Sequence, residues 1–320
     1  MGLRADWNYI LQSRYRNPKE LDLFRTLMEV LQMRNRQYVF IEETHSIVRV
    51  GYLSPKLGYK QVNKEIADLL IIYNDTKNKE IRISFLQAKR SSSGCLFRCG
   101  LPYKFDGDFF QWELLVTRPK IIVANHKLFL CPDILSFTDY KTISSFGVFY
   151  EYVNGGWDMF FTIPEFLFPL NFYKIIPKRN TKLQLNYCLP YHMCNYNCSW
   201  QYGKHKEVNF VCNIDTFEHV LLKGQIGAPI RRHLNIVSII KKHISKLNAH
   251  VHNDNTIGQD IKNRRLTALN LAWNTLLGYD SDTRYGIGEV NGVHLGGRIG
   301  INTLIITGGI DELSSYDVAK

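Results

Sequence analysis

The stretch EIADLLIIYNDTKNKEIRISFLQAKR, residues 65 to 90, places the strongest constraint on the fold. Two runs of β-forming residues flank a polar turn, which is typical of a β-hairpin. Asp68 interrupts the first run, and the second run ends with Gln87 and Lys89. If this hairpin is buried, the three polar side chains need partners.

The register of the hairpin predicts where these side chains lie. Side chains alternate between the two faces of a strand, so Gln87 and Lys89 share a face with the apolar residues that precede them at every second position. Counting outward from a loop at residues 75 to 80 sets Asp68 opposite Gln87. Directly opposed residues share a face, so Asp68, Gln87 and Lys89 are expected to converge at one end of the sheet.

A buried carboxylate or ammonium group is costly unless it is paired or holds a metal ion. The Asp68 carboxylate and the Gln87 amide both supply the oxygen ligands that Mg²⁺ prefers. A lysine such as Lys89 can hold a hydroxide nucleophile and offset charge on a phosphate. This set suits phosphodiester hydrolysis. The alternative is that Asp68 only pairs with Lys89, whose ammonium group reaches solvent at the strand end.

An amphipathic helix is predicted ahead of the hairpin, from Pro18 to Met33. Asn17 is expected as its N-cap, Pro18 at its first position and Glu20 at the capping-box position. Glu20 falls on the apolar side of this helix. The apolar stripe is formed by Leu21, Phe24, Leu27, Met28 and Leu31.

The segments IAD and QAK, on successive strands behind a helix that carries a glutamate, resemble the PD-(D/E)XK nuclease superfamily, in the variant where Gln replaces the acid. The resemblance covers roughly residues 15 to 125. It implies an α/β protein with a restriction endonuclease-like core, in which helices flank a mixed central sheet. It also implies DNA cleavage that depends on Mg²⁺, or on Mn²⁺ in its place.

Carried over residue by residue, the resemblance makes Asp68 the metal-binding acid, Gln87 the second ligand and Lys89 the catalytic lysine. The backbone carbonyl of Ala88 is expected to ligate the metal as well. Glu20 matches the helix glutamate of many members, although a capping box also explains it.

The sequence departs from the family pattern at Ala67, where proline is more typical, and at Gln87, which leaves one fewer negative charge for the metal. Other acids near the motif fit a metal site less well. A strand or loop position would expose them. They are Glu65, Glu42 and Glu43.

The formal net charge of +11 produces a positive field that attracts polyanions and favours nucleic acid as a partner. Arg90, Arg98 and Lys104, beside Tyr103 and Phe105, form a group that can hold a phosphate backbone and stack on bases. A basic amphipathic helix over residues 230 to 247 adds Arg231, Arg232, Lys241 and Lys242. A solvated basic surface is the alternative for both groups.

The rest of the chain predicts further elements. Strands are expected in QYVFIEE, in SIVRVGYL and in KIIVA or KLFLC, and a short helix at 109 to 117. Residues 91 to 108 are expected to be a loop. A second late helix is predicted at 264 to 277, followed by strands with tight turns. We therefore expect a nuclease-like domain at 1–150 and a C-terminal α+β accessory region at 151–320, for DNA contact, oligomerisation or regulation.

Seven cysteines and an N-terminus without an apolar leader favour reduced thiols and a cytoplasmic protein. No membrane partner is expected, because the most apolar stretch, residues 158 to 176, contains two acids and two prolines. It is interpreted as aromatic-rich core strands and loops.

Three groups of possible metal ligands are weaker. Cys188, His192, Cys194 and Cys198 could bind zinc, but they lack a CxxC knuckle, and free cysteines explain them better. Cys95 and Cys99 form a CxxxC pair beside the proposed site. His250 and His252 are interpreted as part of a polar loop between two helices. The glycine-rich end of the chain lacks the GK[ST] motif of a nucleotide-binding loop.

The sequence thus predicts a metal-dependent endonuclease that acts on double-stranded DNA. Its setting as a restriction or anti-phage defence effector follows from the resemblance alone. A homo-oligomer is expected, and an activating ligand or partner protein stays open. The alternatives are an inactive DNA-binding or assembly protein with a nuclease-like fold and an RNA-directed nuclease.

Overall fold

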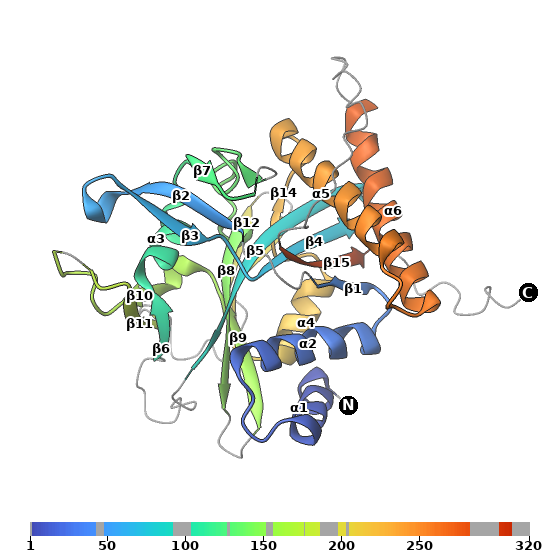
Figure 1. Ribbon diagram of the computed structural model, residues 1–320, viewed down its shortest axis with the longest axis horizontal. Coiled ribbons are helices and arrows are strands. Elements are labelled where there is room, and N and C mark those ends of the chain that lie inside the picture. The colour runs from blue at the N-terminus through green and yellow to red at the C-terminus, as the bar shows by residue number, and fades with distance from the viewer. Residues whose placement is uncertain are drawn as a thin grey trace, which may run out of the picture.

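The computed structural model describes residues 2–42, 48–91, 104–126, 129–151, 156–175, 177–185, 198–202, 205–281 and 301–308. These residues form an α/β structure in which helices flank a mixed central sheet (Figure 1). The expected class, α/β with a mixed sheet between helices, is confirmed at this level.

The central sheet has nine strands in the order β1-β15-β4-β5-β8-β9-β13-β12, and β14 pairs with β5 at one side. Its strands are β1 (Tyr38–Ile41), β4 (Leu69–Asp75), β5 (Glu80–Arg90), β8 (Ser144–Glu151), β9 (Trp157–Thr162), β12 (Cys198–Tyr202), β13 (His205–Val211), β14 (Ala228–Pro229) and β15 (Asn302–Gly308).

The hairpin β4–β5 lies at the centre of this sheet. Its antiparallel register pairs Leu69 with Leu86 and Asn74 with Ile81, as the sequence predicts. Both outer neighbours of the hairpin are parallel strands, β15 beside β4 and β8 beside β5. Because every central strand here has a partner on both sides, the hairpin is part of the core rather than an edge.

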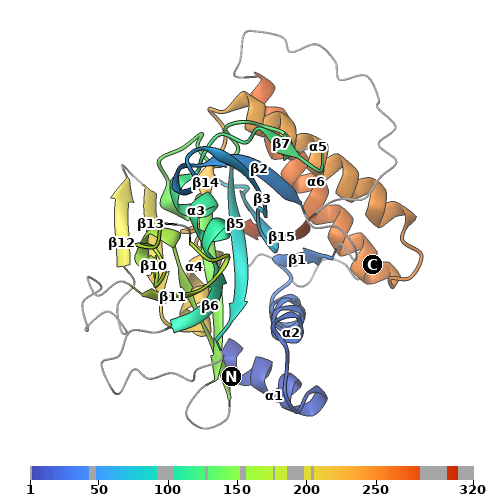
Figure 2. The same cartoon turned by 60° about the vertical axis from the view of Figure 1, so that its left-hand side comes forward.

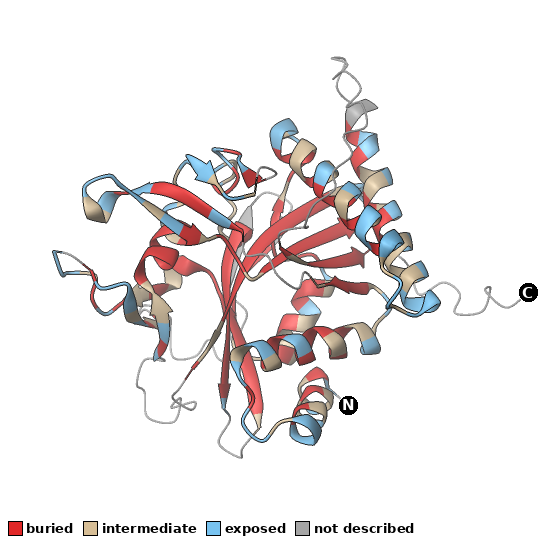
Figure 3. Ribbon diagram, in the orientation of Figure 1, coloured by how far each residue is buried: buried red, intermediate tan, exposed pale blue. Residues whose placement is uncertain are grey.

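Helices cover both faces of the sheet. Residues of α1, α2 and α4 pack with Leu69 and Ile71 on one face, and residues of α3, α5 and α6 pack with Leu70 and Ile72 on the other. Figure 3 shows the central strands buried between these layers. Burial on both faces explains why LLII is continuously apolar instead of alternating. The helices are α1 (Leu3–Arg14), α2 (Glu20–Arg34), α3 (Phe109–Thr117), α4 (Ile214–Leu222), α5 (Leu234–Asn253) and α6 (Gln259–Ser281).

Two small three-stranded sheets lie around α3 (Figures 1 and 2). One contains β2 (Arg49–Ser54), β3 (Lys60–Glu65) and β7 (Val123–Ala124). The other contains β6 (Lys104–Asp108), β10 (Leu167–Pro169) and β11 (Asn180–Leu185).

The predicted N-terminal helix is present, but its start differs from the expectation. It begins at Glu20 with Lys19 as N-cap, and the Asp22 carboxylate accepts a 2.8 Å hydrogen bond from the Lys19 backbone N–H. Asn17 is therefore not the cap, and the capping-box acid is Asp22 rather than Glu20. Leu21 is half exposed, so the apolar stripe begins at Leu23 and Phe24.

Other expectations change in detail. Residues 104 to 108 form β6 instead of a loop, because they pair with β11. His250 and His252 lie in the last turn of α5, not in a loop between helices. The basic helix begins at Leu234, four residues later than expected, and α6 extends the second helix in both directions.

The expected boundary near residue 150 falls inside β8. Strands from both sides of it, β1, β4 and β5 before and β9, β13 and β15 after, belong to the same central sheet. The C-terminal strand β15 lies between β1 and β4 and contacts both along its length. The two regions thus share one sheet.

Residues 158 to 176 contain β9, β10 and the turn between them, in agreement with core strands and loops. Within the described residues, no helix is both long enough and apolar enough to cross a membrane.

Candidate functional site

The candidate site lies where β5 extends beyond β4. The strand β4 begins at Leu69, whereas β5 continues to Arg90, so the last residues of β5 lack a β4 partner. At this end of β5, side-chain carboxylates accept hydrogen bonds from the backbone N–H groups. Asp68 Oδ2 accepts from Ala88 N at 2.7 Å, and Glu20 Oε2 accepts from Arg90 N at 2.9 Å. Two acids from distant parts of the chain therefore occupy one strand edge.

Asp68 and Gln87 meet as the register predicts. Gln87 Nε2 donates to Asp68 Oδ2, and Gln87 Oε1 accepts from Gln111 Nε2 of α3. The Gln87 side chain is almost completely buried, so both ends of its amide need such partners. A half-turn of the amide would exchange its donor and acceptor ends and direct Oε1 toward Asp68.

Lys89 is oriented by the helix glutamate rather than by Asp68. Its Nζ lies 3.9 Å from Glu20 Oε1, and the Lys89 side chain is 17% exposed. Glu20 belongs to the helix layer of α1, α2 and α4 and reaches Lys89 at the open edge of β5. The suggested ion pair of Asp68 with Lys89 is thus replaced by one with Glu20, and Glu20 joins the cluster.

Glu65, at the end of β3, is also part of the cluster. Burial, followed by the negative charge of Asp68, raises the pKa of Glu65 to about 7. Burial likewise raises the pKa of Asp68 to about 6, against the opposing effect of the Lys89 charge. From the sequence alone, Glu65 is expected to be exposed and outside the site. Its position three residues before Asp68, across the buried pair Ile66 and Ala67, is the signal that could have included it.

Gln111 belongs to the site although no sequence pattern predicts it there. It occupies the first turn of α3, where Asp108 Oδ1 accepts hydrogen bonds from Phe110 N at 2.9 Å and Gln111 N at 3.1 Å. An N-cap Asp followed three residues later by Gln is a capping-box pattern. Here the Gln111 side chain bonds to Gln87 instead of to the N-cap backbone. The motif therefore predicts where the helix starts but not the contact with Gln87.

The oxygen atoms at this edge match the donor set that Mg²⁺ or Mn²⁺ prefers. They are the carboxylates of Asp68 and Glu65, the amide oxygen of Gln87 and the backbone carbonyl of Ala88. In an extended strand the N–H and C=O of one residue point to the same side, so the Ala88 carbonyl is directed to the edge that Asp68 occupies. Among the described residues no three His, Cys, Asp or Glu side chains are grouped closely enough to hold a metal ion.

The expected DNA-contacting residues are spread over the molecule. The Arg90 guanidinium lies 5.0 Å from the Trp157 ring centre and donates to Asn17 Oδ1 at 3.0 Å, so it is held by internal contacts. Lys104 is exposed at the start of β6, but Phe105 is buried and cannot stack on bases.

Arg231 and Arg232 follow β14, which pairs with Arg82 and Ile83 near the start of β5. At about 3.3 Å per residue, this is roughly 20 Å from Lys89. The structure therefore does not bring these arginines to the site. Lys241 and Lys242 lie on α5, a helix outside the Asp68 cluster.

Several expected residues fall outside the described part of the chain. These are Glu43, Cys95, Arg98, Cys99, Tyr103, Cys188, His192, Cys194 and the side chain of Cys198.

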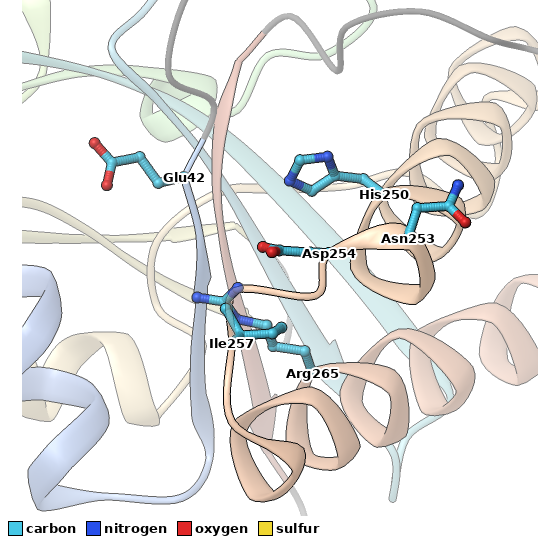
Figure 4. Close-up of a pocket in the computed structure, with 6 residues that line it drawn as sticks. All are labelled: Glu42, His250, Asn253, Asp254, Ile257 and Arg265. Atoms are coloured by element: carbon cyan, nitrogen blue, oxygen red, sulfur yellow. The ribbon is translucent and has the colours of Figure 1, made fainter.

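A pocket of about 440 Å³ opens at the same end of the central strands as Asp68 (Figure 4). Ile41 of β1 pairs with Thr303 of β15, and Asn302 Nδ2 donates to the Asp68 backbone carbonyl at 3.1 Å, so the pocket is two strands away from Asp68. Glu42 forms an ion pair with Arg25 at 2.5 Å and is thus separate from the Asp68 cluster. The pocket is lined by Glu42, His250, Asn253, Asp254, Ile257 and Arg265.

Comparison with known proteins gives no relative: no family model, no curated protein and no solved structure matches this chain.

Proposed function

We propose that this protein is a metal-dependent endonuclease that hydrolyses phosphodiester bonds of double-stranded DNA on a restriction endonuclease-like core. The observation that carries the proposal is the grouping of Asp68, Gln87, Lys89 and Glu20 at the open edge of β5. The formal charge of +11 supports a polyanionic substrate. A role in restriction or anti-phage defence rests on the resemblance of the IAD and QAK segments.

The chain's own oxygens would hold Mg²⁺ or Mn²⁺. Asp68 and Glu65 would supply negative charge, and the Gln87 amide and the Ala88 carbonyl would supply neutral oxygens. A bound divalent ion would contribute Lewis-acid stabilisation of the charge that develops on the phosphate. The Gln111 amide keeps Gln87 in place, because it bonds to the other end of the same side chain.

Lys89 would act on the substrate itself. Its ammonium group can donate hydrogen bonds to a phosphate oxygen and to the attacking water, which offsets charge in the transition state. Glu20, 3.9 Å away, orients that ammonium group and, through Arg90 N, ties α2 to the end of β5.

The test is cleavage of supercoiled plasmid DNA with Mg²⁺ by the wild type and by Lys89→Ala and Asp68→Asn. We expect cleavage by the wild type and a loss of about 10²-fold or more in each variant, the scale of removing one charge-stabilising group. Lys77→Ala is the matched control, because Lys77 is an exposed lysine in the turn at the other end of the hairpin.

Thermal melting of each variant checks that the fold is retained. Cleavage at the wild-type rate by both folded variants would overturn the assignment of the site.

A second candidate function is DNA binding without cleavage. The observation in its favour is that Asp68 Oδ2 already accepts two N–H groups, from Ala88 and Gln87, as a purely structural carboxylate would. This candidate predicts salt-dependent DNA binding and no product with Mg²⁺ or Mn²⁺. The same assay run on RNA separates an RNA-directed nuclease from both.

A further inference from the structure

The two small sheets beside α3 each carry an exposed tyrosine followed directly by an exposed lysine. The β2–β3 hairpin turns through Gly58, Tyr59 and Lys60, and the segment after β10 contains Tyr173 and Lys174. Tyr59 is 69% exposed and Tyr173 is 84% exposed. A single exposed ring needs no partner, so what marks this surface is the combination of two exposed rings with lysines.

Both segments are rich in cations, although Lys64, Arg179 and Lys182 pair with Asp106 or Asp108 of β6. Residues 48 to 64 contain four Lys or Arg and no Asp or Glu, and residues 166 to 185 likewise contain four Lys or Arg and no acid. A surface that combines lysines with exposed rings is complementary to a nucleic acid strand, since lysines neutralise phosphates and rings stack on bases.

The two segments form one surface. Lys56 Nζ, in the turn of the β2–β3 hairpin, lies 5.1 Å from the ring centre of Phe172, which is next to Tyr173. Lys64 of β3 and Asp108 of β6 also join the two sheets, through an ion pair at 2.5 Å. Figures 1 and 2 both show the two small sheets next to each other around α3.

The Tyr173 ring is held by neighbouring rings, and the backbone of Tyr59 is held in a tight turn. Tyr173 packs edge-on against Phe172, with ring centres 5.5 Å apart, and its centre is 5.7 Å from that of Phe168. Tyr59 has a φ of 63°, a left-handed conformation that costs energy for a residue with a bulky side chain. Such strained positions are common at functional surfaces, which makes the Tyr59 turn a reasonable place for a ligand contact.

The hairpin also connects this surface to the candidate site. The strand β3 runs from Lys60 to Glu65, and Glu65 lies beside Asp68. At about 3.3 Å per residue, Tyr59 is roughly 20 Å from Glu65. This distance matches about six stacked nucleotides at 3.4 Å each.

We propose that Tyr59, Lys60, Tyr173 and Lys174 form a second DNA-contacting surface that binds an unpaired strand flanking the duplex at the Asp68 site. The proposal rests on the proposed nuclease function and adds the form of its substrate. Stacking requires bases that are not already paired, so the tyrosines select the unpaired flank. The lysines contact phosphates of paired and unpaired strands alike.

The experiment measures equilibrium binding by fluorescence anisotropy in EDTA, where cleavage does not occur. The probes are a labelled blunt duplex of about 20 base pairs, roughly two helical turns, and the same duplex with a single-stranded tail of about ten nucleotides. We expect the wild type to bind the tailed duplex at least about fivefold more tightly than the blunt one.

Two double variants separate the roles. Tyr59→Ser with Tyr173→Ser should remove the preference for the tail and leave binding of the blunt duplex within about twofold. Lys60→Ser with Lys174→Ser should weaken binding of both the blunt and the tailed duplex. It should also reduce the slope of log affinity against log salt by about one to two. Tyr9→Ser with Lys77→Ser is the matched control, because both residues are exposed on other parts of the molecule.

Equal wild-type affinity for the two probes, or a tyrosine variant that keeps the tail preference, would overturn the surface proposal. No DNA binding by the wild type would also overturn it and would point to a protein partner at the exposed rings. Plasmid cleavage reports separately on the proposed function. A tail preference without cleavage contradicts only the nuclease, and cleavage without a tail preference contradicts only this surface.

Discussion

Asp68 and Glu65 hold carboxylates whose protonation changes close to neutral pH. Burial raises the pKa of Asp68 to about 6 and that of Glu65 to about 7, and the charge of Asp68 raises the pKa of Glu65 further. A raised pKa means that the folded protein disfavours the ionised form. A divalent cation reverses this preference, because it binds the ionised carboxylates. The two acids therefore couple metal binding to pH.

The expected consequence is a cleavage rate that rises with pH through the range of about 6 to 7 and then levels off, since both carboxylates must lose protons to hold the metal. Glu65→Gln should lower metal affinity and move the midpoint of the rise toward the pKa of Asp68 alone. The measurement is plasmid cleavage against pH at several Mg²⁺ concentrations.

Glu29→Gln serves as the control for this pH profile, because Glu29 forms a half-exposed ion pair with Arg14 on the helix surface. A Glu65→Gln profile that coincides with the wild type at all Mg²⁺ concentrations would remove Glu65 from the site.

The helix α3 connects the candidate site to the two small sheets. Its N-cap Asp108 accepts two backbone N–H groups and also pairs with Lys64 at 2.5 Å and Arg179 at 2.9 Å. These contacts hold the pKa of Asp108 below its usual value, although burial acts in the opposite direction. The start of α3 therefore depends on one ionised side chain. The position of Gln111, in the first turn of α3, depends in turn on where the helix starts.

Asp108→Ala should lower the free energy of unfolding by about 1–2 kcal/mol through loss of the cap, with an added cost because the buried Lys64 loses its partner. Asp108→Asn should recover most of the cap contribution, since Asn caps helices as well as Asp does. Urea unfolding measures both. In contrast, Asp106→Ala removes a mostly exposed carboxylate that pairs with Lys182 at the surface, and it should change stability by less than about 1 kcal/mol.

If Asp108→Ala and Asp106→Ala lowered stability equally, Asp108 would not have the anchoring role described above.

The whole molecule depends on a strand near the end of the chain. In β15, Leu304, Ile305 and Ile306 are fully buried, and the strand fills the position between β1 and β4. Burying an aliphatic side chain contributes about 1.5–3 kcal/mol, so the three together approach the net stability of a typical domain, about 5–15 kcal/mol. The hairpin that carries Asp68 and Lys89 is thus supported by residues more than 200 positions away in sequence.

A truncation that ends after Ser281 should therefore lose cooperative unfolding, because β1 and β4 lose their shared partner. A truncation after Gly308 retains β15 and should keep the transition. Circular dichroism during thermal unfolding distinguishes the two. A cooperative transition in the shorter chain would show that residues before Ser281 fold without β15.

The local sequence was sufficient for the parts of the fold that depend on local periodicity. The register of β4 and β5 follows from the position of the turn, so Asp68 and Gln87 were correctly expected to face each other. The helices α2, α5 and α6 follow from apolar residues at helical spacing, although their ends moved by several residues. The helix ends are set by individual hydrogen bonds, such as the one from Lys19 N–H to the Asp22 carboxylate. From the sequence alone, nearby Glu20 could form such a bond equally well.

The tertiary structure alone decided which side chains complete the site. Glu20 could have capped its own helix, but the end of β5 brings Arg90 N and Lys89 to it. Glu65 is partly buried because β3 ends beside Asp68, and Gln111 reaches Gln87 because Asp108 starts α3 at that point. The insertion of β15 between β1 and β4 has no local signature either. These contacts join residues far apart in sequence, and their formation depends on the packing of the whole sheet rather than on any repeating pattern along the chain.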